Sequence, residues 1–417
     1  SLSSMNGLGA IVSGRDMGTE SPLPARQIIL WSPQTDAHIL AGGKDSGGTL
    51  PRYSITDVGT LPGDIESDAI GLNDKGEVVG ESIATHIDDG QAVGHGFVWK
   101  AGLMYDLGVT HGYQTSTAFR INKNDQIAGT VENNGQPVTI KTISRACWWH
   151  SGAIHVLPLG PLAVWDMAVG INDHCAIIGT LSLPMTRMMP VMHAALWRNG
   201  RLRDLGILPG FPSASAVAIN AQEDIVCNSE RFENVESQVR LLSRAYLWQN
   251  GKKTDLGLLP GCNSSRANKI NDAGEIIGQC SAETFARPIG PQRAFVWQNH
   301  HMVELNGLEG SVSSSPFGIN DLGDIVGIGS LPTPGVGFDM QSATDFPSPD
   351  DGSTNLDALT TTAVLWRTGR AYDLNSLIPA DSGWHLTSAN AVNNRGQIVG
   401  QGVQDGKKRG YLLTPIL

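Results

Sequence analysis

The side chains best suited to chemistry in this chain are charged residues that depart from a repeated sequence pattern. Two residues before a recurring asparagine, most copies of the pattern have glycine or alanine, but two copies have Arg120 and Lys269. Six residues before the same asparagine, where other copies mostly have serine or threonine, one copy has Asp166. A buried cation needs an anionic partner, which either the protein or a ligand must supply.

These three residues support two functional interpretations and one structural interpretation. In the first, Arg120 and Lys269 bind an anionic group of a ligand. In the second, the protein is an enzyme in which Asp166 is the general base and Arg120 stabilises developing negative charge. A salt bridge between Arg120 and Asp166 explains the same residues without any ligand.

Further candidates lie where one copy of the pattern leads into the next. His111 and His385 could transfer protons near neutral pH, and Arg266 could bind a charged group. The aromatic residues that could stack on a sugar or another planar ligand are Tyr113, Trp165 and Trp384. Because the sequence has no clustered metal ligands, no nucleotide-binding glycine motif and no HExxH motif, we expect neither a metal site nor a cofactor.

The elements that must position these residues are short and repeat along the chain. Five of the seven intervals between the recurring asparagines lie between 48 and 51 residues. The asparagines are Asn6, Asn73, Asn122, Asn172, Asn220, Asn271, Asn320 and Asn393. Each copy has four apolar runs bounded by Gly, Asn, Asp or Pro, which is typical of β-strands. The Asn-Asp-x-Gly segment between the first two runs predicts a tight turn, so we interpret its asparagine and glycine as turn residues.

Repeated four-stranded units of this length predict an all-β protein, a β-propeller with antiparallel blades. Alanine usually stands four residues before the asparagine, and isoleucine, leucine or valine directly before it, which suits innermost strands that converge on an axis. A tryptophan in the third run predicts packing between blades. The tryptophans are Trp31, Trp99, Trp149, Trp197, Trp248, Trp297 and Trp366.

The number of blades depends on the two ends of the chain. Tyr53–Gly59 resembles a fourth strand without a third strand before it, whereas the last copy ends at Gly410–Leu413 without a fourth strand. Pairing these segments closes a ring of eight blades, in a single domain of residues 1–417 with residues 1–50 as the first blade. Seven blades, with residues 1–50 as an N-terminal appendage, are the alternative. Residues 328–362 are expected to form a long inserted loop.

Three motifs carry a resemblance to a known family. INDAGEIIG, RAFVWQN and DLGLLPG resemble the HAF-type repeats of a bacterial extracellular repeat family. The resemblance covers nearly the whole chain except about the first 50 residues. It implies a β-propeller-like fold and a secreted or surface protein, and it names no reaction.

Charge and hydropathy restrict the partners. The 29 Lys and Arg residues against 40 Asp and Glu residues give a formal charge of −11, which disfavours nucleic acid. No apolar run is long enough for membrane insertion. The first residues, SLSSMNGLGAIVSG, lack a signal-peptide pattern, so only the resemblance favours an extracellular location.

We therefore predict a monomeric propeller that binds a small anionic, aromatic or glycan-like ligand in its central funnel. The loops between second and third strands, and those that lead from one blade to the next, would surround this ligand. A metal-independent lyase, hydrolase or cyclase in the same funnel is the alternative. A protein-interaction scaffold is the third possibility.

Overall fold

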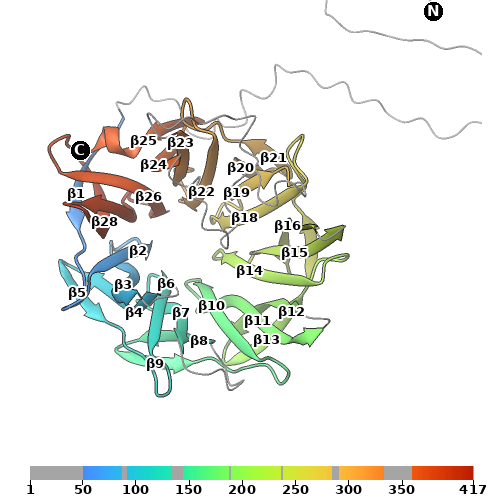
Figure 1. Cartoon of the computed structure of the whole chain (residues 1–417). Helices are drawn as coiled ribbons and strands as arrows, with labels where there is room; N and C mark the ends of the chain where they lie inside the picture. Colours follow the sequence, from blue (N-terminus) through green and yellow to red (C-terminus); the bar gives the residue numbers. More distant parts are fainter. Residues whose placement is uncertain are drawn as a thin grey trace, which may run out of the picture. The chain divides into compact units, whose positions relative to one another are not determined.

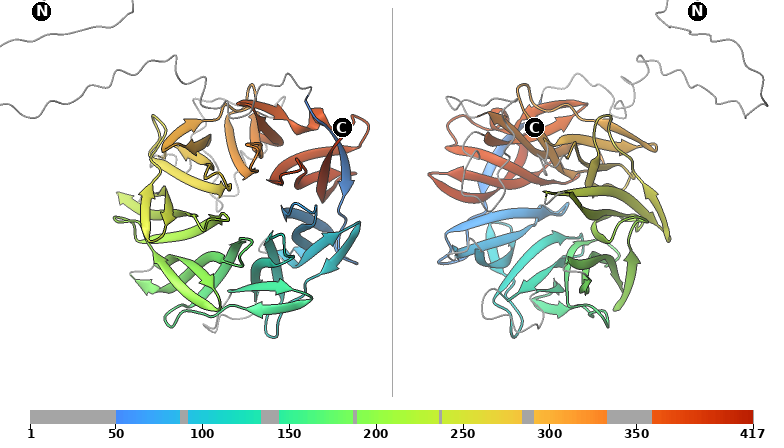
Figure 2. Two further views of the ribbon diagram at one scale, coloured as in Figure 1. Left: turned by 180° about the vertical axis from the view of Figure 1, so that it is seen from behind. Right: turned by 45° about the vertical axis from the view of Figure 1, so that its right-hand side comes forward.

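The computed structural model describes residues 50–86, 92–133, 144–186, 189–235, 238–283, 291–332 and 359–416. Within these residues, seven four-stranded antiparallel sheets surround a central axis as the blades of a β-propeller (Figure 1). The prediction of an all-β propeller with four-stranded blades is confirmed. Figure 2 shows from further directions that the first strand of each blade lies nearest the axis.

The strands follow the same order in every blade. The innermost strands are β2 (Glu66–Leu72), β6 (Thr115–Ile121), β10 (Trp165–Ile171), β14 (Ser213–Ile219), β18 (Ser264–Ile270), β22 (Ser313–Ile319) and β26 (Trp384–Val392). The second strands are β3 (Val78–His86), β7 (Ile127–Glu132), β11 (Ile177–Thr186), β15 (Ile225–Val235), β19 (Ile276–Ser281), β23 (Ile325–Pro332) and β27 (Ile398–Gln404).

The third and fourth strands complete the blades toward the outside. The third strands are β4 (Ala92–Lys100), β8 (Ser144–His150), β12 (Met189–Arg198), β16 (Gln238–Gln249), β20 (Arg293–Gln298), β24 (Leu359–Arg367) and β28 (Lys407–Ile416). The fourth strands are β5 (Leu103–Asp106), β9 (Ala153–Val156), β13 (Arg201–Gly206), β17 (Lys252–Asp255), β21 (His301–Glu304), β25 (Arg370–Asp373) and β1 (Arg52–Asp57), and a 3-10 helix, η3 (Leu374–Leu377), follows β25. We number the blades I to VII in the order of their innermost strands, from β2 to β26.

Blade VII joins the two ends of the described chain. Its fourth strand, β1, pairs antiparallel with β28, so that Tyr53 lies opposite Pro415 and Asp57 opposite Tyr411. The predicted pairing of the isolated fourth strand with the incomplete last copy is therefore confirmed. The favoured number of eight blades was wrong, and the alternative of seven holds, because β1 fills the only open place in the described ring.

Some of the sequence predictions lie outside the described residues. These are the first copy of the pattern with Asn6 and Trp31, and most of the expected inserted loop, residues 333–358. Of its two ends, residues 328–332 belong to β23 and residues 359–362 to β24.

The core consists of apolar layers between neighbouring blades. The six predicted third-strand tryptophans that lie in the described residues are all buried, as the inter-blade interpretation predicts. Trp99 of blade I, for example, packs in one cluster with Val399 and Leu412 of blade VII. Burial between blades is necessary because a single four-stranded sheet cannot cover both of its apolar faces.

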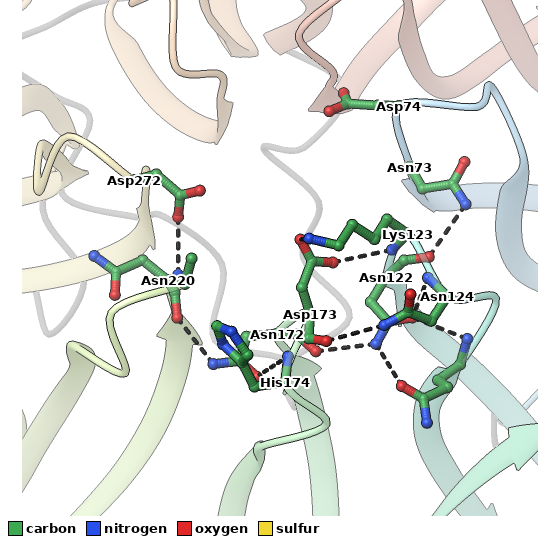
Figure 3. A network of polar contacts seen from close by, with 12 residues as sticks. Asn73, Asp74, Asn122, Lys123, Asn124, Asn172, Asp173, His174, Asn220 and Asp272 are labelled. Carbon is green, nitrogen blue, oxygen red and sulfur yellow. Dashed lines mark hydrogen bonds and ion pairs between the residues drawn. The ribbon is translucent and has the colours of Figure 1, made fainter.

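A closed ring of side-chain hydrogen bonds connects the seven blades. The Nδ2 group of each recurring asparagine donates to the backbone carbonyl of the asparagine in the next blade, at 3.0–3.3 Å. Asn393 of blade VII donates in turn to Asn73 of blade I and completes the ring. Figure 3 shows the part that runs through Asn73, Asn122, Asn172 and Asn220. These buried asparagines therefore stabilise the ring as well as their own turns.

Candidate functional site

The innermost strands line a central channel. Because strand side chains alternate in direction, buried positions that face the blades alternate with half-buried positions that face the channel, as in β2. One ring of channel positions lies three residues before the asparagines and is mainly apolar. It comprises Ile70, Phe119, Val169, Val217, Asn268, Phe317 and Asn390. A charge in this channel therefore interacts more strongly with other charges than it would in bulk water.

Arg120 lies beside a β-bulge of the innermost strand β6. Each innermost strand shifts its register at the position three residues before its asparagine, and in β6 the shift falls between Ala118 and Arg120. The Nη1 group of Arg120 donates to the carbonyl oxygens of Phe119, at 2.7 Å, and of Ile70 in blade I, at 3.0 Å. Its Nε group is buried and has no hydrogen-bond partner among the described residues. Burial lowers the pKa of Arg120 to about 10, so the guanidinium stays charged at neutral pH.

Lys269 occupies the equivalent position of blade V, three blades away from Arg120. Burial lowers the pKa of Lys269 well below its ordinary value, and the positive charge of Arg120 lowers it further. Charge effects weaken with distance, so the two side chains are close enough to repel one another. Lys269 is half-buried. In the described part of the chain, no hydrogen bond or ion pair of its amine is found.

The carboxylates of the innermost strands do not neutralise these two cations. The three carboxylates are Glu66, Asp68 and Asp166. Their contacts are with Lys408, Asn390 and Arg145, respectively. Within the described ranges, neither Arg120 nor Lys269 therefore forms an ion pair with a carboxylate.

Asp166 lies between blades II and III and not in the channel. It is fully buried, and its Oδ1 accepts hydrogen bonds from Arg145 Nε at 3.0 Å and from the backbone of Ala146 at 2.9 Å. Burial raises the pKa of Asp166, and the hydrogen bond from Ala146 and the charge of Arg145 partly offset this. The expected salt bridge with Arg120 is not formed, because Asp166 points toward β8. The role of Asp166 as a general base stays a prediction.

Other blades show why a carboxylate fits at this position. In blade II, the serine hydroxyl of Ser116 accepts a hydrogen bond from the backbone of Gly96 and donates one to the carbonyl of Gly108. Asp166 accepts the equivalent backbone hydrogen bond but has no proton to donate when it is charged. Arg145 balances its charge and donates to the nearby carbonyl of Leu157. The pair is therefore a structural equivalent of the serine.

Arg266 lines a separate cavity of about 150 Å³ at the junction of blades IV and V. Its Nε donates to Ser243 Oγ at 2.9 Å, and its Nη2 lies 3.0 Å from Glu230 Oε1. The other lining residues are Leu241, Ser264, Ser265, Gln279, Ser281, Glu283 and Gln292. Neither Arg120 nor Lys269 lines this cavity, so the structure does not bring the three predicted cations into one site.

The remaining predicted residues are dispersed among the blades. His111 and His385 are exposed, whereas Trp165 is half-buried at the start of β10. Tyr113 packs against an apolar cluster of blades I and II, and Trp384 makes an edge contact with the ring of Tyr411, with centroids 6.1 Å apart. Among the described residues, no hydrogen bond, ion pair or ring contact joins any two of the predicted site residues. Their roles stay predictions.

Sequence reasoning did not select Asp68, which faces the channel in blade I. Burial raises the pKa of Asp68 to about 6, and a hydrogen bond from Asn390 Nδ2 at 2.9 Å partly offsets this. Asp68 can therefore donate or accept a proton near neutral pH. A signal was present in the sequence, because the equivalent position holds no other carboxylate. The other blades have Thr117, Met167, Ser215, Arg266, Ser315 and Ser388 there.

The end of the channel beside the asparagine ring widens into a cavity of about 250 Å³, which we call the acidic vestibule. Its rim consists of the residues that directly follow the asparagines. They are Asp74, Lys123, Asp173, Ala221, Asp272, Asp321 and Asn394. Several rim carboxylates accept a hydrogen bond from the backbone of the preceding blade, as Asp173 does from Lys123 at 3.0 Å (Figure 3).

Among the described residues, no group of three or more His, Cys, Asp or Glu side chains could hold a metal ion. The same part of the chain has no helix with the length and apolar character needed to cross a membrane.

One protein family matches part of the sequence. Residues 211–411 match a family described as a protein of unknown function (DUF3466). The match spans slightly less than half of the chain and does not confirm the resemblance to HAF-type repeats. No curated protein matches the chain.

Solved structures with a similar fold have low sequence identity to this chain. The β-propeller domain of the trilobed protease from Pyrococcus furiosus is 9% identical, with a TM-score of 0.47 over 84% of this chain and 95% of that chain. An oligogalacturonate lyase in complex with manganese is 10% identical, with a TM-score of 0.47 over 88% and 96%. Trypanosoma rangeli sialidase is 7% identical, with a TM-score of 0.37 over 88% and 60%. These similarities are too weak to assign an activity to the chain.

Proposed function

We propose that the propeller binds a small organic anion in its central channel, between Arg120 and Lys269. What supports the proposal is that neither cation forms an ion pair with a carboxylate of the described residues, and that the positive charge of Arg120 lowers the pKa of Lys269. Arg120 is the charged anchor at neutral pH, since its pKa stays near 10. In the proposed site, Lys269 contacts the anion from the opposite side.

A bound anion would relieve two unfavourable terms at once. The first is the loss of hydration of both cations in the channel, and the second is their mutual repulsion. The anion favours the protonated form of Lys269, so binding is coupled to uptake of a proton. The affinity should therefore increase as the pH is lowered toward the pKa of Lys269 in the free protein.

The test compares ligand binding with the stability of the unliganded protein. Lys269→Met removes an unpaired cation, so it should raise the melting temperature by roughly 1–3 °C in the absence of ligand. The same substitution should weaken binding of small carboxylates and phosphates by about tenfold or more in calorimetry. Lys123→Met, in the acidic vestibule, is the matched control and should leave anion binding unchanged.

A structural role for Lys269 predicts the opposite behaviour. The proposal fails if Lys269→Met lowers the melting temperature and the wild-type protein binds none of these anions. It also fails if Arg120→Met binds them as tightly as the wild type does.

A second candidate function is a metal-independent enzyme that uses acid–base chemistry in the same channel. The observation that favours it is Asp68, a half-buried channel carboxyl whose pKa of about 6 suits proton transfer near neutral pH. Asp68→Asn should then abolish turnover of a bound anion while it leaves the affinity within about twofold. Turnover is measured by NMR. If it is unchanged in Asp68→Asn, this residue is not the acid or base.

A further inference from the structure

The cavity of about 150 Å³ beside Arg266, which we call the inter-blade cavity, has a polar wall from blade V. Two pairs of its lining residues lie opposite one another in β18 and β19. They are Arg266 with Gln279 and Ser264 with Ser281. Opposite residues of an antiparallel pair point to the same face of the sheet. These four side chains therefore line the cavity together.

The facing wall belongs to blade IV and is partly apolar. Asn228 Nδ2 of β15 donates to a backbone carbonyl of β18 at 2.9 Å, and Glu230 forms an ion pair with Arg266. Because strand side chains alternate in direction, Phe232 leaves β15 on the same face as these two residues. Phe232 lies opposite Leu241, which lines the cavity, and Phe232 is 49% exposed. The cavity thus has an accessible aromatic ring beside it.

The polar wall retains hydrogen-bonding groups for a ligand. Arg266 uses Nε and Nη2 for its contacts with blade IV, and Gln279 Oε1 accepts from Asn268 Nδ2 at 2.6 Å. Within the described ranges, Arg266 Nη1 and Gln279 Nε2 form no hydrogen bond. The buried Glu283 adds a carboxylate, which accepts hydrogen bonds. Donors and acceptors are therefore both present.

Charge and size restrict the ligand further. Among the described lining residues, one cation, Arg266, is balanced by one carboxylate, Glu283, and Arg266 also has Glu230 as a counter-ion. This lining does not favour an anion. A volume of about 150 Å³ corresponds to roughly five water molecules at about 30 Å³ each, which leaves room for one small ring and not for a chain of rings.

We propose that the inter-blade cavity binds a single neutral pyranose unit, at a site separate from the anion site proposed above. Each sugar hydroxyl can donate and accept a hydrogen bond, so the hydroxyls accept from Arg266 Nη1 and Gln279 Nε2 and donate to the Glu283 carboxylate. The C–H face of the sugar packs against the ring of Phe232. A pyranose has polar edges and apolar faces, and these match the two walls of the cavity.

The test measures the binding of neutral sugars to the full-length protein. The probes are the methyl glycosides of glucose, galactose, mannose, xylose and N-acetylglucosamine, followed by saturation-transfer NMR and calorimetry. We expect at least one of them to bind with a dissociation constant of about 1 mM or lower. Phe232→Ala should weaken this binding about threefold to tenfold, because the apolar surface buried against the ring is lost. Gln279→Leu removes one hydrogen bond and should weaken it about fivefold.

Two matched variants are the controls. Tyr105→Ala removes an aromatic ring of nearly the same exposure, 50%, from blade I. Gln401→Leu changes the glutamine at the equivalent position of blade VII. Both should bind the glycoside as tightly as the wild type does. The proposal is overturned if none of these glycosides binds, or if Phe232→Ala and Gln279→Leu both keep the wild-type affinity.

Arg120→Met separates this site from the anion site. Glycoside binding should be unchanged in Arg120→Met, and its loss would assign the sugar to the channel and overturn the inter-blade site. Glucuronate, which carries a carboxylate on the glucose ring, should bind Arg120→Met no more tightly than methyl glucoside does. Binding of glucuronate about tenfold tighter would overturn the choice of a neutral ligand. Since neither site needs the other, failure of every glycoside to bind leaves the anion site intact.

Discussion

Replacing Asn122 tests whether the asparagine ring stabilises the propeller. The side chain is only 5% exposed. Its Nδ2 donates to the carbonyl of Asn172 at 3.0 Å and to Gln126 Oε1 at 2.8 Å. Its Oδ1 accepts from the backbone of Asn124 and of Gln126, both at 3.0 Å. Asn122→Ala removes all four hydrogen bonds, which at about 1 kcal/mol each gives a loss of roughly 4 kcal/mol.

This loss is measurable by calorimetry. For a ring of roughly 370 residues, an unfolding entropy near 2.1 cal/mol/K per residue converts 4 kcal/mol into a decrease of about 5 °C in melting temperature. Asn124→Ala is the control, because its side chain makes only an exposed hydrogen bond to the carbonyl of Asp173. It should change the melting temperature by less than about 1 °C.

Asn122→Asp isolates the bond between blades. It keeps the oxygen that accepts the two backbone hydrogen bonds but replaces the donor with a second carboxylate oxygen. Burial should raise the pKa of this new carboxyl, and the protonated form can donate to the carbonyl of Asn172. Its stabilising contribution is then fully present below the unfolded pKa near 4 and is lost as the pH rises through the folded pKa. A melting temperature of Asn122→Ala within 1 °C of the wild type would refute the reasoning, and so would an Asn122→Asp deficit that is independent of pH.

Three further predictions concern other contacts. Arg145→Ala leaves the buried Asp166 carboxylate without its counter-charge and should cost about 3 kcal/mol in urea unfolding, and a second change, Asp166→Ser, should recover most of this. Asp68→Asn should be more stable than the wild type at pH 8 and equal to it near pH 4. The reason is that the pKa of Asp68 is raised in the folded protein, so the wild type loses stability as the pH rises through about 6. The same difference in melting temperature between variant and wild type at both pH values would contradict this. Deleting residues up to Asp57 removes β1. This should lower the melting temperature by at least about 5 °C relative to a chain that begins at Leu50. An unchanged melting temperature would show that β1 does not close the ring.

The architecture could be predicted from the sequence because each blade repeats the same local sequence features. Strand length, turn residues and inter-blade tryptophans are all local features, and a single copy around Asn271 shows nearly all of them. The number of blades is not determined by local sequence features. It depends on whether β1 pairs with β28, and counting the copy at Asn6 gave one blade too many for the described ring.

The site was less predictable, since the direction of a side chain depends on the bulge and on the neighbouring blades. Arg120 and Asp166 both depart from the pattern, yet Arg120 bonds to a carbonyl of the neighbouring innermost strand β2 and Asp166 to the third strand β8. The asparagines were interpreted as turn residues, which is correct for Oδ1, but the Nδ2 bonds join residues about 50 positions apart. Asp68 was missed because its position varies too much among the blades to define a pattern.

The asparagine ring has a direction of rotation. Every amide donates to the blade that follows it in the chain, and Asn393 continues the same sense to Asn73. Each residue whose backbone carbonyl accepts such a bond donates the next one through its side-chain amide, so the seven bonds follow one another around a closed circuit. A circuit of this kind has no terminal member, so every blade of the described ring is joined by these bonds to both of its neighbours.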